Sequence, residues 1–253
     1  IKSKEFNAIL GGSLTLDNNV TVGAFFEGGT SDYDTYNTFQ RDGDIRGDGD
    51  SNFFGLGLFT KFQDDSGFFA ELSLRGGKSK TSFQSDTFIS GDGLMASYKV
   101  KPSYFGTHIG AGYEWKTSDQ LAFKVGARYF YTEVKGKDFM LGSDPIHFDK
   151  VKSSRARVTA GLTNTFSNEA SITADIGYEY EFDGQVDGRT HTVHAIDAPS
   201  IKGGSALLNL GVDYVPSGAK NLTLNANIEG YAGKRRGGSF GLRMTYFYEK
   251  DSQ

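Results

Sequence analysis

The sequence predicts an all-β fold, an antiparallel barrel whose consecutive strands run up and down next to each other. Three observations support this prediction. Apolar and polar residues alternate in many successive runs, as they do where side chains point to opposite faces of a strand. Short polar connections alternate with long ones along the chain. Pro is scarce, with four in 253 residues, so that long strands are permitted.

The alternation is clearest from Ala170 to Phe182, where every second residue is apolar and those between are Ser, Thr, Asp, Gly or Glu. Residues 222–232 repeat this pattern. Residues 121–132 also alternate, but Lys124 and Arg128 lie on their polar face. Acidic and basic side chains therefore share one face, which indicates an interior that contains water.

Alternation and turn residues together predict about eleven strands. In chain order we expect them at residues 5–16, 20–29, 52–62, 67–78, 103–115, 121–133, 153–165, 170–182, 205–215, 222–232 and 239–248.

The connections fall into two classes that alternate strictly. The short ones are residues 17–19, 64–66, 117–120, 166–169 and 216–221, and the long ones, expected to be loops, are residues 30–51, 79–102, 134–152 and 183–204. An up-and-down barrel has this order when one rim faces a confined space and the other carries external loops. Residues 94–100 could add a further strand, but Pro102 and the tight spacing count against this alternative.

The strand count predicts one strand more than the chain shows. Single-chain bacterial barrels have an even number of strands and both chain ends at the short-turn rim. Here the first connection is already short, so we expect twelve strands in the parent protein, with the first missing. Residues Ile1-Lys2-Ser3 directly precede an alternating run. We therefore interpret residues 1–253 as one domain truncated at its N-terminus.

Composition excludes several classes of protein. No run of about 18 apolar residues is present, which excludes membrane-spanning helices. A mean hydropathy of -0.42 still fits a membrane barrel, because half of each strand faces water. The net charge of -4 and the lack of a basic stripe give no reason to expect nucleic-acid binding. The absence of Cys excludes disulfides and thiolate chemistry.

The many aromatic residues indicate that the apolar face of the strands contacts lipid rather than a protein core. Buried in a soluble core, so many Tyr hydroxyls would need partners, whereas at the headgroup level of a membrane they form girdles. The residues expected to face outward near strand ends are Tyr113, Trp115, Tyr129, Tyr131, Tyr178, Tyr180, Tyr246 and Tyr248.

Charged residues of both signs are expected to face the lumen. The candidates are Glu71, Arg75, Glu114, Lys124, Arg128, Arg155, Arg157, Asp175, Glu179, Glu181, Asp213, Glu229 and Arg243. They could line a hydrated channel that holds an extended polypeptide or a helix, or they could form cross-strand pairs that set the register. The two interpretations are compatible.

Other polar clusters are weaker signals. Residues 42–50 contain Asp-Gly repeats that could wrap Ca²⁺ but lack the closing Glu of an EF-hand, and the Arg46-Gly47-Asp48 tripeptide is too short to be informative. His191 and His194, near Asp187 and Asp197, could form a metal or acid–base site or be exposed loop residues. No catalytic motif is present. We expect no enzymatic activity, no cofactor and no metal.

Several segments resemble the translocator (β) domain of Gram-negative autotransporters. They are residues 110–115 (GAGYEW), 126–131 (GARYFY), 178–184 (YEYEFDG), 198–204 (APSIKGG) and 229–237 (EGYAGKRRG). The resemblance implies a twelve-stranded barrel in the bacterial outer membrane, in contact with its lipid, that supports type V secretion and surface anchoring of an N-terminal passenger. The family also has a linker helix in the pore. No such helix is predicted in this chain.

The last strand resembles the terminal signal that the barrel assembly machinery reads, a Gly followed by alternating apolar and aromatic residues. Here the signal is Gly241, Leu242, Met244, Tyr246 and Tyr248, but the chain continues for five residues instead of stopping at an aromatic. Two alternatives to a translocator stay open, a free-standing porin or channel and an outer-membrane enzyme. A passenger encoded upstream would favour the translocator.

Overall fold

The computed structural model describes residues 2–16, 19–39, 43–89, 92–190, 194–196 and 200–248. Strands and their connections make up this part of the chain, and it holds no helix long and apolar enough to cross a membrane. The all-β prediction is confirmed.

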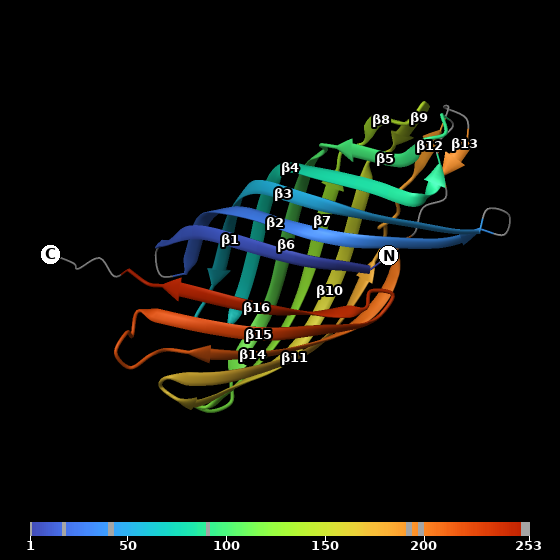
Figure 1. The fold of residues 1–253 in the computed structure, drawn as a ribbon. Coiled ribbons are helices and arrows are strands. Elements are labelled where there is room, and N and C mark those ends of the chain that lie inside the picture. The colour runs from blue at the N-terminus through green and yellow to red at the C-terminus, as the bar shows by residue number, and fades with distance from the viewer. Residues whose placement is uncertain are drawn as a thin grey trace.

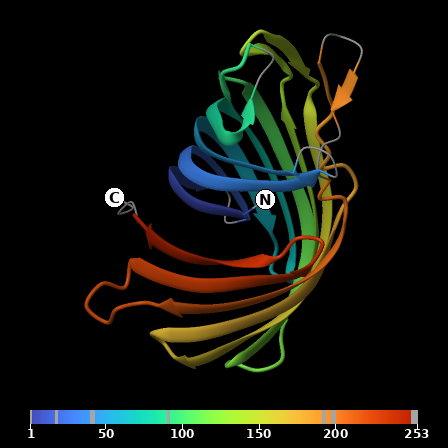
Figure 2. The same cartoon turned by 45° about the vertical axis from the view of Figure 1, so that its right-hand side comes forward.

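The main sheet has twelve strands, of which eleven follow one another in chain order and curl into a trough (Figures 1 and 2). Each pairs antiparallel with the next, which is the predicted up-and-down order, and all eleven predicted strands are present. They are β1 (Lys2–Leu16), β2 (Val20–Phe39), β3 (Gly43–Gln63), β4 (Phe68–Ile89), β6 (Ser103–Lys116), β7 (Leu121–Val134), β10 (Val151–Ser167), β11 (Ala170–Glu181), β14 (Gly203–Tyr214), β15 (Leu222–Gly233) and β16 (Gly237–Tyr246).

The two outer strands, β1 and β16, leave the wall open. No ladder joins them in the described part of the chain, and every described residue of β1 is exposed. An unpaired strand edge presents free N–H and C=O groups that another strand can pair with. A strand upstream of β1, like the interpretation of residues 1–253 as a single domain, stays a prediction.

The prediction that the long connections are loops was wrong, because strand pairing continues past the rim. β2 and β3 stay in register as far as Phe39 and Gly43. A strand at residues 94–100 was the disfavoured alternative, yet β5 (Met95–Val100) pairs with the outer half of β4. Pro102 separates β5 from β6, but its carbonyl accepts a hydrogen bond from Ser79 N at 2.9 Å. β4 pairs with β6 along its first part and with β5 further on, so β5 continues the position of β6 in the sheet. It therefore adds no strand to the wall.

A small second sheet stands at the same rim. It consists of β8 (Lys137–Leu141), β9 (Asp144–Phe148), β12 (Gly188–Thr190) and β13 (His194–Ile196), in the order β13-β12-β9-β8. Aromatic contacts join it to the main sheet, since the Tyr98 ring of β5 lies 4.6 Å from that of Phe139. The chain thus builds ordered structure where the sequence predicted irregular loops.

The apolar residues lie mainly on the outer face of the wall rather than in a core. Buried apolar residues are few, whereas large apolar side chains such as Ile109, Ile176 and Leu242 are exposed on the strands. On β6 the exposed apolar positions run from Trp115 to Phe105, ten residue steps or about 33 Å along a strand. With the usual barrel tilt of about 40° this band is about 25 Å tall, which matches the hydrocarbon layer that barrels span.

In the small sheet, His147 is expected to titrate above the ordinary range of histidine. Its Nδ1 lies 2.5 Å from Asp138 Oδ1 and its Nε2 lies 3.2 Å from Asp149 Oδ1. The hydrogen bond to Asp138, and then that to Asp149, raise the pKa of His147. Because the folded-state pKa is raised, the pairs stabilise this sheet fully below the unfolded pKa, and the stabilisation is lost as pH rises through the folded pKa.

NMR titration of the His147 ring measures this shift. Asp138→Asn should lower the midpoint, because it removes the larger of the two causes. A midpoint that Asp138→Asn leaves unchanged would contradict the assignment.

The charged lumen as candidate functional site

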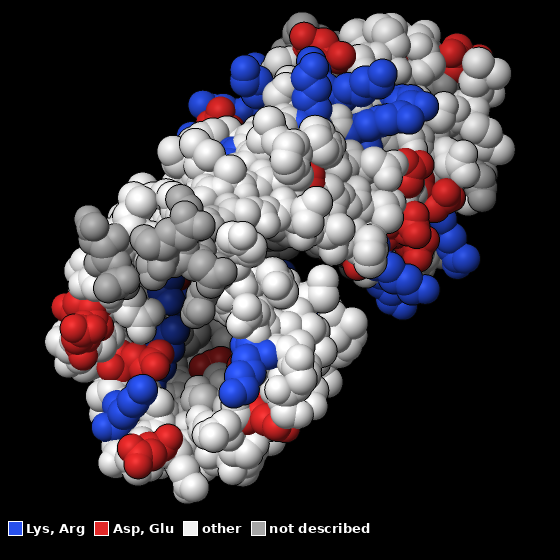
Figure 3. Space-filling model, turned by 90° about the vertical axis from the view of Figure 1, so that its left-hand side faces the viewer, with Lys and Arg blue, Asp and Glu red and all other residues white. Residues whose placement is uncertain are grey.

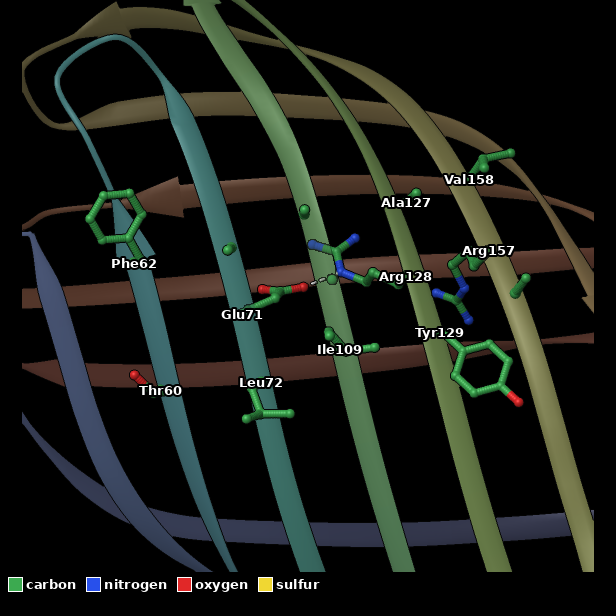
Figure 4. Close-up of a pocket in the computed structure, with 14 residues that line it drawn as sticks. Thr60, Phe62, Glu71, Leu72, Ile109, Ala127, Arg128, Tyr129, Arg157 and Val158 are labelled. Atoms are coloured by element: carbon green, nitrogen blue, oxygen red, sulfur yellow. Dashed lines mark hydrogen bonds and ion pairs between the residues drawn. The ribbon is translucent and has the colours of Figure 1, made fainter.

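On the inner face, Glu71 and Arg128 meet in the space above a glycine. Register places Glu71 of β4, Gly110 of β6 and Arg128 of β7 in one row across the sheet. A Cβ at Gly110 would lie 2.9 Å from Glu71 Oε1 and 3.0 Å from Arg128 Cγ, so the missing side chain lets the two charges reach each other. Arg128 Nε donates to Glu71 Oε1 over this row (Figure 4). His108 joins them, with Nε2 at 3.2 Å from the same oxygen.

A second cluster is centred on Glu179 of β11, which is only 3% exposed. Three guanidinium groups surround its carboxylate: Arg157 Nη2 lies at 2.8 Å, Arg235 Nη1 at 3.3 Å and Arg155 Nη1 at 3.5 Å. Arg157 also lies 3.3 Å from Glu229 and donates to the Tyr231 hydroxyl at 2.9 Å. The cluster therefore links β10, β11, β15 and the turn after β15.

Two further carboxylates are buried on the inner face. Glu181 accepts hydrogen bonds from the Ser153 hydroxyl at 2.6 Å and from Ser154 N at 2.7 Å. Glu27 of β2 accepts from Arg75 at 3.1 Å and from the Tyr104 hydroxyl at 2.6 Å. Buried carboxylates are tolerated only with such partners.

The sequence prediction omitted Glu27, Tyr104, His108 and Arg235. Strand parity could have found Glu27, since it follows the exposed Phe26 and so points inward. Arg235 lies in the turn between β15 and β16, where strand alternation cannot predict which way a side chain points. Only the folded structure shows that it reaches Glu179.

The remaining predicted lumen residues have looser contacts. Lys124 Nζ lies 3.9 Å from Glu114 and 4.5 Å from the ring centre of Phe69. Asp175 and Asp213 accept from the neutral amides of Asn209 and Asn225, at 2.8 and 2.9 Å. Arg243 on β16 is exposed and forms no ion pair with the described residues. The inner face thus combines closed ion-pair clusters with open polar stretches.

The weaker polar clusters of the sequence form no site that the structure shows. Within the described residues, no group of three or more His, Asp or Glu is arranged to hold a metal ion. Asp42, His191 and Asp197 lie outside these residues, and Asp187 is exposed. Residues 43–50, expected to be a solvated loop, are part of β3.

The predicted assembly residues lie on the edge strand. Leu242, Met244 and Tyr246 of β16 and the following Tyr248 are all exposed, and Gly241 lies opposite Asn227. Residues 249–253 lie outside the described part of the chain. Of the predicted outward aromatics, Tyr131 is half-buried, and its hydroxyl donates to Glu133 at 2.9 Å.

An up-and-down wall with an apolar outer face and a charged inner face is typical of outer-membrane barrels. The sequence profile of the Autotransporter beta-domain family matches residues 1–229. The chain belongs to this family, and it is a translocator barrel of the bacterial outer membrane. The chain is therefore assigned to the type V secretion class, to which autotransporters belong.

Solved translocator domains have the same fold. The transport unit of the autotransporter AIDA-I from Escherichia coli aligns with a TM-score of 0.73 at 12% identity, over 97% of this chain and 83% of that one. The translocator domain of NalP from Neisseria meningitidis gives 0.69 at 15% identity, over 97% and 80%. The β domain of Bordetella BrkA gives 0.65 at 14% identity, over 96% and 90%. Comparison with curated proteins finds no significant match.

Proposed function

We propose that this barrel supports secretion of an N-terminal passenger and then anchors it at the cell surface. The observation that carries the proposal is the inner face, on which charges of both signs are held among open polar stretches. Such a surface binds water and can contact a polypeptide of varied sequence at low cost, because its own charges are already paired.

The proposed roles of the lumen residues follow from their partners. Glu71, Arg128, Glu179 and Arg157 lie in closed clusters and would set the shape of the lumen. The residues with looser contacts would contact the passenger or its linker helix; they are Glu114, Lys124, Asp175, Asp213 and Arg243. No catalytic step is part of this role.

The exposed residues of β16 have a separate role in this proposal. Leu242, Met244 and Tyr246 present an alternating apolar edge that the barrel assembly machinery would read during insertion. In the folded barrel the same side chains would face lipid.

Epitope tags on intact cells test the proposal. A tag in the chain upstream of Lys2 should be labelled on intact cells, because the passenger side is displayed outside. A tag in the β8–β9 turn at residues 142–143 should also be labelled, and one in the turn at residues 217–218 should be reached only after permeabilisation.

The two turn tags are controls for orientation and assembly. If both behave as expected and the upstream tag is labelled only after permeabilisation, secretion is refuted and the porin alternative is favoured. Ion conductance of the purified protein in a planar bilayer would then measure the open channel.

A further inference from the structure

The outer face of the wall changes character towards the rim that carries β5 and the small sheet. On β4 the exposed Leu72 and Leu74 are followed, on the same face, by Lys78 and Lys80. On β7 the order is Tyr129, Tyr131 and Glu133, and Lys135 follows directly after the strand ends at Val134. An apolar band, then aromatic residues, then cations is the order of side chains across the boundary between hydrocarbon and headgroups.

Register gathers these lysines into one patch although they are distant in sequence. Lys78 pairs with Ser103, whose carbonyl accepts from Lys135 N at 2.9 Å. Lys135 and Lys150 lie one step beyond the paired residues Val134 and Val151. We call this the lysine patch; it comprises Lys78, Lys80, Lys101, Lys135, Lys137 and Lys150, all of them exposed.

The patch has an excess of positive charge although the chain as a whole is acidic. Three nearby acids have basic partners: Glu133 lies 3.5 Å from Lys150, and Asp138 and Asp149 contact His147. Asp50, diagonal to Lys80 across β3 and β4, accepts hydrogen bonds from the neutral side chains of Ser82 and Asn52 instead. The other five lysines form no ion pair with any described residue. Figure 3 shows several Lys and Arg side chains in the upper part of the molecule, with a few Asp and Glu side chains beside them.

We propose that the lysine patch binds the phosphorylated headgroups of outer-leaflet lipid. The position of the patch supports this partner over a soluble anion, because the patch lies directly above the apolar band, where acyl chains and phosphates of one lipid molecule can be contacted together. Charge complementarity supplies the attraction, and the flexible lysine stems allow the ammonium groups to reach the phosphates. The site lies outside the lumen and is independent of passenger secretion.

Native mass spectrometry of the protein in dodecyl maltoside micelles tests the proposal with diphosphorylated lipid A as the probe. The double variant Lys78→Gln/Lys135→Gln should bind about 30-fold more weakly at low ionic strength, since each lysine near an anionic lipid surface contributes a factor of about five. Added salt should weaken binding to the parent protein. Lys78→Arg/Lys135→Arg keeps both charges and should bind like the parent.

The matched control is Lys116→Gln/Lys220→Gln, which removes two exposed lysines at the short-turn end of the wall. It should leave lipid A binding within about twofold of the parent. An equal loss in both double variants, no loss in either, or the same loss with dephosphorylated lipid A would overturn the proposal. A heat-dependent shift in gel mobility verifies that each variant is folded.

Discussion

Glu179→Gln is expected to destabilise the folded barrel by about 3 kcal/mol, because it leaves Arg155, Arg157 and Arg235 together without their shared carboxylate. Glu179 is almost fully buried, whereas Arg235 is partly exposed, so water screens part of the repulsion and the low end of the range applies. The measurement is equilibrium unfolding in micelles with guanidinium chloride, followed by the fluorescence of Trp115, the one tryptophan of the chain.

Asp175→Asn is the matched control for this variant. It is the same change of carboxylate to amide on the same face of β11, but the partner is the neutral Asn209. Its free energy of unfolding should stay within about 1 kcal/mol of the parent. If the two variants lose the same stability, the Glu179 cluster has no special role in holding the wall.

Phe69→Ala is expected to cost about 3 kcal/mol of stability, because it leaves a cavity at one of the few buried apolar side chains. Phe69 is 2% exposed and lies opposite Gly112 of β6, with Gly126 next in the same row. A Cβ at Gly112 would collide with the Phe69 ring, so the ring occupies the space that the glycine leaves open. Lys124 Nζ also lies over the Phe69 ring, 4.5 Å from its centre. The same unfolding experiment measures the loss.

The neighbouring Phe68 is the control for this variant. It belongs to the same strand but faces outward and is 41% exposed. In Phe68→Ala the lost contacts are with lipid or detergent, so the expected loss is about 1 kcal/mol or less. Equal losses for the two variants would show that the inner packing around Phe69 contributes no more than the outer surface does.

The strands of the wall were predictable because a two-residue period is a local property. Each strand separates two environments, so apolar and polar residues must alternate wherever the wall crosses the membrane. Above the rim both faces of a hairpin contact water, so apolar and polar residues no longer have to alternate. The extensions of β2 and β3 carry no such apolar period, and the sequence prediction treated them as loops. In β5, Ala96, Tyr98 and Val100 do alternate with exposed residues, but the nearby Pro102 counted against a strand there.

For the lumen, the sequence predicts which residues share the inner face of the wall, and it does not predict which of them contact each other. Parity places Glu71, Arg128 and Glu179 inward, but it cannot say that Glu71 reaches Arg128 across Gly110. That contact depends on the register of three strands. Arg235 reaches Glu179 from a turn, for which no period exists.

The sequence by itself determined the all-β class and the order of the wall strands, since both follow from local alternation and connection length. The face assigned to each strand residue by parity stays a prediction. Only the tertiary structure decided which charges meet, which glycines make room for them and which distant lysines form one outer patch. These depend on strand register and on the curvature of the sheet, which are set by the packing of the whole wall.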